Sequence, residues 1–273
     1  MKSRDEKHFI IHRHFSDIAH RYHLLRTTDV EPIAFIAGRL KSLEQIEAID
    51  IGCGTGRYDL LLFKYLAPKL RLTCADSNSD MLDVLEKNLV NNGISDFTSV
   101  NAKAENIPSQ DNMYDSVFTF NAIHHFDLLE FLRETARILK TVGHIFIYTR
   151  LRDQNRRNIW GRYFPMFNQK ETRLYTLNKF VKTIEKVPNL HIKSIEYYKY
   201  GRISTLTQLI DRARSHHYST FYLYSSEELE EAIKGFTHNL ESKFKDISRV
   251  HWFDENIIFM IDKKEPFSVA TSD

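Results

Sequence analysis

A glycine-rich turn preceded by an acidic residue is the part of this sequence best suited to bind a ligand. The apolar run 46–51 contains Asp50, and Gly52, Gly54 and Gly56 follow it at alternate positions. Glycine accepts a positive φ and has no side chain, so a strand that ends in such a turn lets a ligand touch the backbone. The N–H groups at the start of the following helix favour an anion such as a carboxylate. The spacing therefore predicts a strand–turn–helix unit that holds a cofactor.

The position of the third glycine distinguishes this turn from the dinucleotide-binding fingerprint. In that fingerprint the third glycine comes three residues after the second, where this chain has Arg57. Asp76 ends the next β-favouring run, and a carboxylate there accepts hydrogen bonds from both hydroxyls of a ribose. Nicotinamide-dependent enzymes place an acid similarly, so Asp76 alone does not identify the nucleoside cofactor.

Strands and helices alternate through the first 150 residues, and this alternation predicts where the motifs lie. Such alternation indicates a parallel α/β sheet with helices on both faces. Ligands of such sheets bind in the crevice at the carboxyl ends of the strands, where the glycine turn and Asp76 both lie. We expect strands at 46–51, 71–75, 97–100, 116–120 and 144–148, and helices at 57–66, 79–91 and 128–139.

The alternation breaks after residue 149. Residues 150–182 are rich in Arg and Lys, interleaved with aromatic residues, and their acidic residues are Asp153 and Glu171. Beyond this segment we expect a strand at about 191–200, helices near 204–216 and 226–244, and a last strand at 256–261. The last two strands are therefore separated by a long connection, which is expected to be functional or to form its own subdomain.

The composition indicates an ordinary globular chain. Its 273 residues are 42% hydrophobic and 27% charged, which predicts a core of normal size. The formal net charge of +2 is too small to indicate a nucleic-acid partner by itself. The two cysteines, Cys53 and Cys74, do not provide a disulfide framework, and they fit a reducing compartment.

The sequence favours a cytoplasmic protein without a membrane span or a metal site. Its apolar runs are shorter than the ~18 residues that a membrane span needs. Residues 1–6 lack the apolar core of a secretion signal. His8, His12 and His14 have no carboxylate or cysteine ligand set beside them, so we expect them to form a polar helix face.

Five segments together resemble the motifs of class I S-adenosylmethionine-dependent methyltransferases, and they extend over about residues 9–150. The glycine turn resembles the first motif of the family, E/D-x-G-x-G-x-G. Segment 114–125 resembles the F-D-x-V-x-x-x-x-x-L-H-H pattern of the ubiquinone/menaquinone-type enzymes. The remaining segments are 15–22, 101–108 and 134–143, which resemble F-D-x-x-A-x-x-Y, G-D-A-E-x-L-P and R-x-L-K-P-G-G.

The resemblance implies a doubly wound, mostly parallel seven-stranded sheet of the Rossmann-like type with an added helical cap. It implies a cofactor-binding core over 1–150, a cap segment with the last two strands over 151–264, and a flexible tail over 265–273. The activity that it implies is methyl transfer from S-adenosylmethionine to a small-molecule acceptor, with S-adenosylhomocysteine as the product.

The resemblance also assigns cofactor contacts residue by residue. Tyr22 covers the methionine carboxylate, Arg26 adds a charge-assisted bond, and Met81 contacts the adenine, although surface and core-packing roles stay open for these three. Lys103 stands where the family has an acidic residue and cannot accept the adenine proton, so this contact is expected from Ala104 or Glu105. The full expected set is Tyr22, Arg26, Asp50, Gly52, Cys53, Gly54, Gly56, Asp76, Ser77, Met81, Ala104, Glu105 and Asn121.

Two neighbouring histidines, His124 and His125, are the candidates for a catalytic base. They follow Asn121, which leaves the fourth strand beside the expected methionine end of the cofactor. An imidazole there is able to take a proton from an oxygen or nitrogen of the acceptor. The alternative is that one histidine packs and caps the next helix.

The basic and aromatic segment is the expected acceptor site. Its candidate residues are Arg156, Arg157, Trp160 and Arg162, because guanidinium groups pair with carboxylates or phosphates and aromatic rings contact an apolar ring. This predicts a small acceptor with anionic and aromatic character, unless the segment is only a solvated basic face. An RNA acceptor and a cofactor-binding fold without catalysis are the alternative functions. The sequence leaves the oligomeric state open.

Overall fold

The computed structural model describes residues 15–16, 19–21 and 27–264 of the chain. The chain divides into two compact units. The first, here called the sheet unit, contains residues 29–149 and 177–196 and the chain from residue 258 onward. The second, here called the helical unit, contains residues 150–176 and 197–257. The predicted tail, 265–273, lies outside the described residues.

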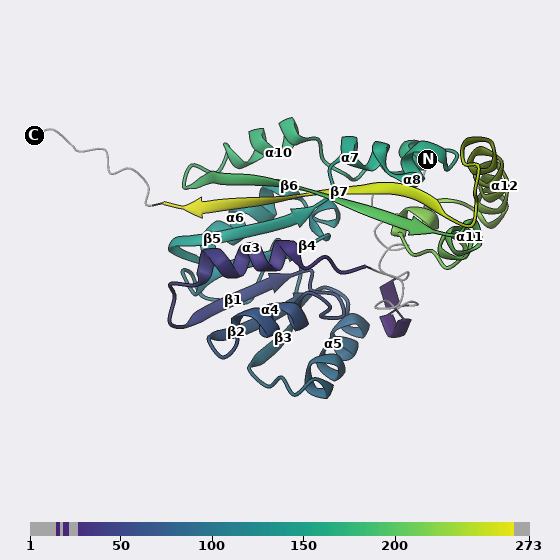
Figure 1. Cartoon of the computed structure of the whole chain (residues 1–273). Coiled ribbons are helices and arrows are strands. Elements are labelled where there is room, and N and C mark those ends of the chain that lie inside the picture. Colours follow the sequence, from purple (N-terminus) through teal and green to yellow (C-terminus); the bar gives the residue numbers. More distant parts are fainter. Residues whose placement is uncertain (1–14, 17–18, 22–26, 265–273) are drawn as a thin grey trace, which may run out of the picture. The chain divides into compact units, whose positions relative to one another are not determined.

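One seven-stranded sheet contains every strand that the sequence predicted. The strand order is β3-β2-β1-β4-β5-β7-β6. Strands β1 to β5 pair in parallel, and β6 and β7 run in opposite directions as the antiparallel hairpin (Figure 1). The predicted fold class is therefore confirmed. The strands are β1 (Ile46–Ile51), β2 (Leu70–Asp76), β3 (Phe97–Asn101), β4 (Tyr114–Phe120), β5 (Leu139–Thr149), β6 (Leu190–Ser204) and β7 (Val250–Lys263).

The strand order reverses between β1 and β4, and this reversal creates the ligand crevice of the fold. The chain runs from β1 through β2 to β3 on one side, and β4 then pairs with the other side of β1. Ile49 faces Thr73 on one side and Val117 on the other, and both Ile49 and Val117 have no exposed surface. Central strands that are buried on both faces explain why these runs are apolar rather than alternating.

Helices of the sheet unit begin where the sequence supplies capping side chains. Asn78 accepts a hydrogen bond of 3.1 Å from the backbone N–H of Met81 at the start of α5, and Asp127 accepts one of 3.1 Å from Leu129 at the start of α6. Helix α3 packs on α4, and α10 packs on α6. The helices are α3 (Glu31–Leu40), α4 (Asp59–Leu66), α5 (Ser79–Asn91), α6 (Leu128–Ile138) and α10 (Leu177–Ile184).

The join between α6 and β5 is shorter than the expected turn. Strand β5 begins at Leu139, directly after the last residue of α6. The register between β4 and β5 shifts between Tyr114 and Ser116, and Val142 takes a positive φ of 60°. The segment that resembles R-x-L-K-P-G-G therefore becomes an irregular strand start. Val142 is 78% exposed, so its side chain meets no crowding from the fold even though its backbone is strained.

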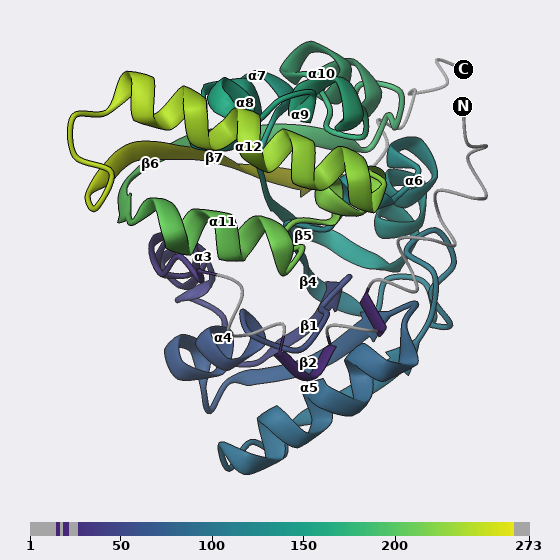
Figure 2. The same cartoon turned by 90° about the vertical axis from the view of Figure 1, so that its right-hand side faces the viewer.

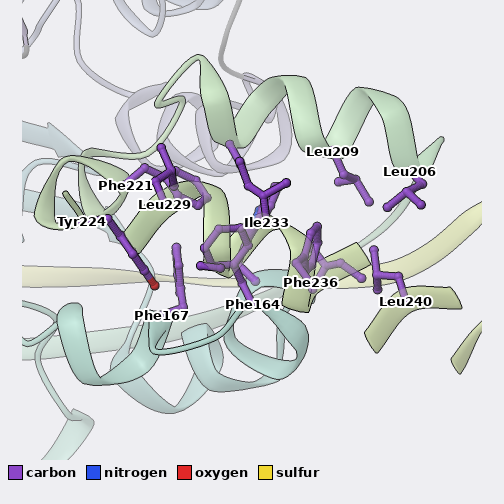
Figure 3. Close-up of a cluster of buried hydrophobic side chains, with 14 of the residues drawn as sticks. Phe164, Phe167, Leu206, Leu209, Phe221, Tyr224, Leu229, Ile233, Phe236 and Leu240 are labelled. Carbon is purple, nitrogen blue, oxygen red and sulfur yellow. The ribbon is translucent and has the colours of Figure 1, made fainter. Parts of the chain in front are cut away.

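The helical unit has its own hydrophobic core (Figure 3). Trp160, Phe164, Phe167, Phe221 and Phe236 are all buried there, with ring centroids of Trp160 and Phe236 5.1 Å apart. The predicted helices near 204–216 and 226–244 are present as α11 and α12, which lie side by side (Figure 2). The helices are α7 (Arg152–Arg157), α8 (Ile159–Tyr163), α9 (Phe167–Lys170), α11 (Leu206–Arg214) and α12 (Ser226–Lys243).

Within the part of the chain that the structure describes, none of the helices combines the length and the apolar character that crossing a membrane requires.

Candidate cofactor site

The turn after β1 has a backbone shape that only glycine adopts easily. Gly52, Gly54 and Gly56 have φ values of 76°, 58° and 78°. The backbone N–H of Gly52 donates to the carbonyl of Ala75 at 2.7 Å, which continues the pairing of β1 with β2 into the turn. A Cβ on Gly52 would lie 2.6 Å from the Cβ of Ala122, closer than atoms can approach. The first glycine therefore serves close packing as well as the turn.

Gly54, in contrast, faces open space. A Cβ built at this position meets no atom within 4 Å. There is therefore space beside Gly54, although its backbone N–H is donated to Asp76. This difference between two glycines of one motif is visible only in the folded chain.

Asp76 holds the turn in place. Its Oδ2 accepts a hydrogen bond of 2.9 Å from the backbone N–H of Gly54, and its Oδ1 accepts one of 2.9 Å from the N–H of Asn78. Each carboxylate oxygen has two lone pairs, so an oxygen that accepts one hydrogen bond is able to accept another. Asp76 therefore connects β2, the glycine turn and the start of α5, while its carboxylate remains half-buried.

Two buried carboxyl groups lie behind the turn. Asp50 is 1% exposed and Asp59 is fully buried. Burial raises the pKa of Asp50 well above its usual range, and the nearby carboxyl of Asp59 raises it further. Burial also raises the pKa of Asp59. Among the described residues, neither oxygen of Asp59 has a hydrogen-bond partner. Each of these two carboxyl groups is therefore protonated more easily than an exposed carboxyl group.

The remaining residues of the glycine turn and of β2 differ in accessibility. Cys53 is buried, and burial together with the neighbouring Cys74 raises the pKa of its thiol. A buried thiol with a raised pKa is a poor nucleophile, and the backbone N–H and C=O of Cys53 are hydrogen-bonded to Ala75 and Gly56. Ser77 is exposed, whereas Met81 is 2% exposed.

The segment after β3 is held by its own hydrogen bonds. Ala104 is 6% exposed, and Lys103 forms an isolated bridge with Asn106. Glu105 accepts a hydrogen bond of 2.7 Å from the backbone N–H of Asp127, which begins α6. Glu105 thus positions a helix start, and its carboxylate is partly used by that contact.

Asn121 ends β4 in a strained conformation. Its φ is 56°, and its backbone N–H donates to the carbonyl of Tyr148 at 2.7 Å. The Nδ2 of Asn121 lies 3.5 Å from the hydroxyl oxygen of Tyr58. Tyr58 in turn stacks on Phe120 at 4.4 Å, with the guanidinium of Arg57 4.5 Å from its ring. Strain at a strand end beside a ligand crevice is typical of functional sites.

Tyr58 is a residue that sequence reasoning did not select. Burial raises the pKa of its hydroxyl, so it stays a neutral donor. A tyrosine next to a glycine turn is commonly a packing residue, so the presence of Tyr58 in the sequence does not by itself indicate a ligand site. The contact of Tyr58 with Asn121 is what connects it to the site.

The two candidate histidines lie on a single turn of 3-10 helix, Ile123–His125. The rings of His124 and His125 are 4.1 Å apart, and both side chains are half-buried. Asn121 and both histidines therefore follow the carboxyl end of β4, as predicted. Tyr22 and Arg26 lie outside the described residues.

The four predicted acceptor residues have different environments in the helical unit. Trp160 is 3% exposed in the hydrophobic core, so its ring packs there. Arg157 forms an ion pair with Glu255, and Arg156 lies 3.9 Å from Asp153. Arg162 lines a cavity. The structure thus brings Arg157 and Arg162 to one cavity and leaves Trp160 out of it.

Comparisons with known proteins agree with this fold. Residues 49–147 match the family described as Methyltransferase domain. A demethylmenaquinone methyltransferase of Thermotoga maritima is 29% identical over 173 residues, which cover 61% of this chain and 72% of that protein.

Solved structures share the architecture at low identity. The YcgJ protein from Bacillus subtilis has a TM-score of 0.63 and 15% identity, over 86% of this chain and 99% of the other. Geranyl diphosphate methyltransferase in complex with S-adenosylmethionine has a TM-score of 0.55 and 11% identity, over 86% of this chain and 85% of the other. These similarities show that the chain has the fold of these proteins, and that its residues 49–147 match a methyltransferase domain.

Proposed function

We propose that this protein transfers a methyl group from S-adenosylmethionine to a small organic acceptor. The observation that carries the proposal is the connection between Gly54 and Asp76. An open glycine backbone and a ribose-binding carboxylate are joined by a hydrogen bond of 2.9 Å at the carboxyl ends of β1 and β2. This arrangement holds both halves of a nucleoside cofactor site in one orientation.

The residues of the site fit the chemistry of this cofactor. Asp76 suits the ribose hydroxyls, and the turn leaves room for a ligand beside Gly54, whose own N–H is held by Asp76. We place the adenine near Ala104, as the family resemblance implies. The cofactor supplies a methyl group on a sulfonium, which is already reactive toward nucleophiles. The protein therefore needs mainly to align the acceptor and to exclude water.

The residues after β4 are proposed to face the acceptor. Asn121 is held by Tyr58 and by the carbonyl of Tyr148, so its side chain has a fixed position. His124 or His125 would take a proton from an acceptor that starts protonated. An acceptor that is already ionised would need no base, and exchange of both histidines would then leave the rate unchanged.

A small acceptor fits the helical unit better than RNA does. Arg150, Arg157, Lys170 and Arg173 each form an ion pair with an acidic residue of the same unit. With Arg156, which lies 3.9 Å from Asp153, five of the nine cations in 150–182 are paired locally, whereas RNA binding needs many cations free for phosphates. The names of two similar proteins, demethylmenaquinone methyltransferase and geranyl diphosphate methyltransferase, also refer to small organic molecules.

Calorimetry with S-adenosylhomocysteine and with NADH tests the cofactor assignment. We expect saturable binding of S-adenosylhomocysteine and none of NADH, because the third glycine lies at position 56 and not at 57. Binding of NADH alone would overturn the proposal.

A screen with labelled S-adenosylmethionine against metabolite fractions then tests catalysis. Label should pass to a small molecule and remain in the protein-free filtrate after nuclease treatment. Transfer to RNA alone would contradict the small acceptor, and cofactor binding without any transfer would contradict the enzyme activity.

A further inference from the structure

A cavity of about 430 Å³ lies entirely within the helical unit. Its floor is formed by the outer halves of β6 and β7, and α8 contributes residues to its wall. Lys199, Gly201 and Ile203 alternate along β6, so they point to one face of the hairpin. The residues that matter for its chemistry are Arg162, Lys199, Arg202, His251, Trp252 and Phe253.

Cations outnumber acids around this cavity. Glu255 is the acidic residue that lines it, and Glu255 pairs with Arg157. Arg202 pairs with Asp254 at 3.3 Å. Arg162 and Lys199 are exposed, and neither forms an ion pair with any residue that the structure describes. The cavity therefore keeps two positive charges that no acid of the described chain neutralises.

Apolar side chains lie directly beside these charges. Phe253 is 55% exposed and Ile203 is 51% exposed, although both are large and apolar. The ammonium of Lys199 lies 4.4 Å from the centre of the Phe253 ring. Exposed apolar surface that adjoins cations suits a ligand that carries both an apolar body and an anionic group.

Gly201 leaves space in the floor between Lys199 and Ile203. A Cβ at this position would be 3.8 Å from the ring of Phe253, an ordinary contact distance. Crowding therefore does not require a glycine at position 201, and the backbone does not require one either, because the φ of Gly201 is not positive. The missing side chain keeps open the space beside the ring of Phe253.

The volume and the lining together define the ligand. Sites for small organic ligands measure roughly 300–1,000 Å³, so this cavity is too large for a simple ion and suited to one small molecule. Arginine and lysine supply donors for a phosphate or carboxylate, and the aromatic rings suit a flat apolar group. We propose that the helical unit binds a small organic anion with a flat apolar body in this cavity.

The lining residues of this cavity all belong to the helical unit, and none belongs to the glycine turn that is proposed to bind the cofactor. Binding of an anion in this cavity and binding of S-adenosylhomocysteine are therefore separate measurements. The failure of either one leaves the other interpretable.

Calorimetric titration of the whole chain with 1-naphthyl phosphate tests the proposal. We expect saturable binding with one site per chain. Inorganic phosphate and 1-naphthol should each bind at least about tenfold more weakly, because the first lacks the flat apolar ring and the second lacks the anionic group. The absence of binding, or binding of inorganic phosphate as tight as that of the naphthyl ester, would overturn the proposal.

Charge variants locate the binding in the cavity. Arg162→Gln and Lys199→Gln should each weaken the binding of 1-naphthyl phosphate about tenfold, since each removes one charge-assisted contact. Lys234→Gln is the matched control, because Lys234 is 74% exposed on α12 and does not line the cavity. Equal affinity in all three variants would contradict the assignment.

A volume variant tests the apolar half of the site. Gly201→Leu should abolish binding by filling the space beside Phe253, while binding of S-adenosylhomocysteine and the far-ultraviolet circular dichroism stay unchanged. Unchanged binding of 1-naphthyl phosphate in this variant would show that the ligand lies elsewhere.

Discussion

The backbone N–H of Gly54 and the carboxylate of Asp76 are joined by a hydrogen bond of 2.9 Å. This bond crosses from the turn after β1 to the end of β2, 22 residues further along the chain. This carboxylate fixes the shape of the turn, and we propose that it also accepts hydrogen bonds from a ribose. The cofactor site is therefore preorganised by one of the groups that is proposed to bind the cofactor.

Replacing Asp76 should weaken cofactor binding more than it weakens the fold. Asp76→Asn keeps the shape but replaces one oxygen with a donor, so it loses charge-assisted hydrogen bonds. We expect S-adenosylhomocysteine to bind about 10- to 100-fold more weakly, or ~1.5–3 kcal/mol. Calorimetry measures this, with Asp83→Asn on the exposed face of α5 as the matched control. Equal affinity of both variants would contradict the role of Asp76.

The first two glycines of the turn should respond differently to alanine. At Gly52 a Cβ would lie 2.6 Å from Ala122 and 2.8 Å from Phe126, so Gly52→Ala combines a clash with backbone strain. We expect a loss of roughly 2–4 kcal/mol in the free energy of unfolding. At Gly54 the space is open, and Gly54→Ala should cost only about 1 kcal/mol from its φ. Urea denaturation compares the two, and a larger loss at Gly54 would be inconsistent with this geometry.

The buried carboxyl pair should make the protein less stable as the pH rises. Burial raises the pKa of Asp59 in the folded state above its value in the unfolded chain. The folded state then binds more protons, so stability is fully present below the unfolded pKa of about 4 and falls as the pH rises toward the folded pKa. Asp59→Asn removes this titration. We expect the variant to gain thermal stability over the wild type between pH 4 and pH 7, and a gain that shrinks with rising pH would argue against it.

Glu134 should show the opposite pH dependence. Its carboxylate accepts hydrogen bonds from Arg137 and, at 2.6 Å, from the backbone N–H of Ile107. The hydrogen bond from Arg137 is the main cause that lowers the pKa of Glu134. Stability from this group is present above the unfolded pKa and is lost as the pH falls through the lower folded pKa. Glu134→Gln should cost about 1 kcal/mol at pH 7 and less at pH 3, measured by denaturant unfolding. Arg133, on the same helix, provides a control because its ion pair with Glu130 is exposed.

Local sequence was sufficient for most of the sheet unit. The predicted strand at 46–51 is β1, Ile46–Ile51, and the predicted helix at 79–91 is α5, Ser79–Asn91, with Asn78 as its cap. These features are local because an apolar run, a glycine turn and a capping side chain act within a few residues. Strand β5 was predicted too short, since residues 139–143 pair with β4 only through a register shift.

The sequence by itself determined the α/β class, the strand–turn–helix unit around the glycines and the position of Asp76 at the end of the next strand, because these depend on residue types at short spacing. The folded chain alone decided that Trp160 packs in a core, that Asp50 and Asp59 lie buried together, and that Lys199 and Phe253 face one cavity. Each of these results depends on contacts between residues far apart in the chain. Such contacts arise from how helices and strands pack, and no spacing in the sequence specifies them.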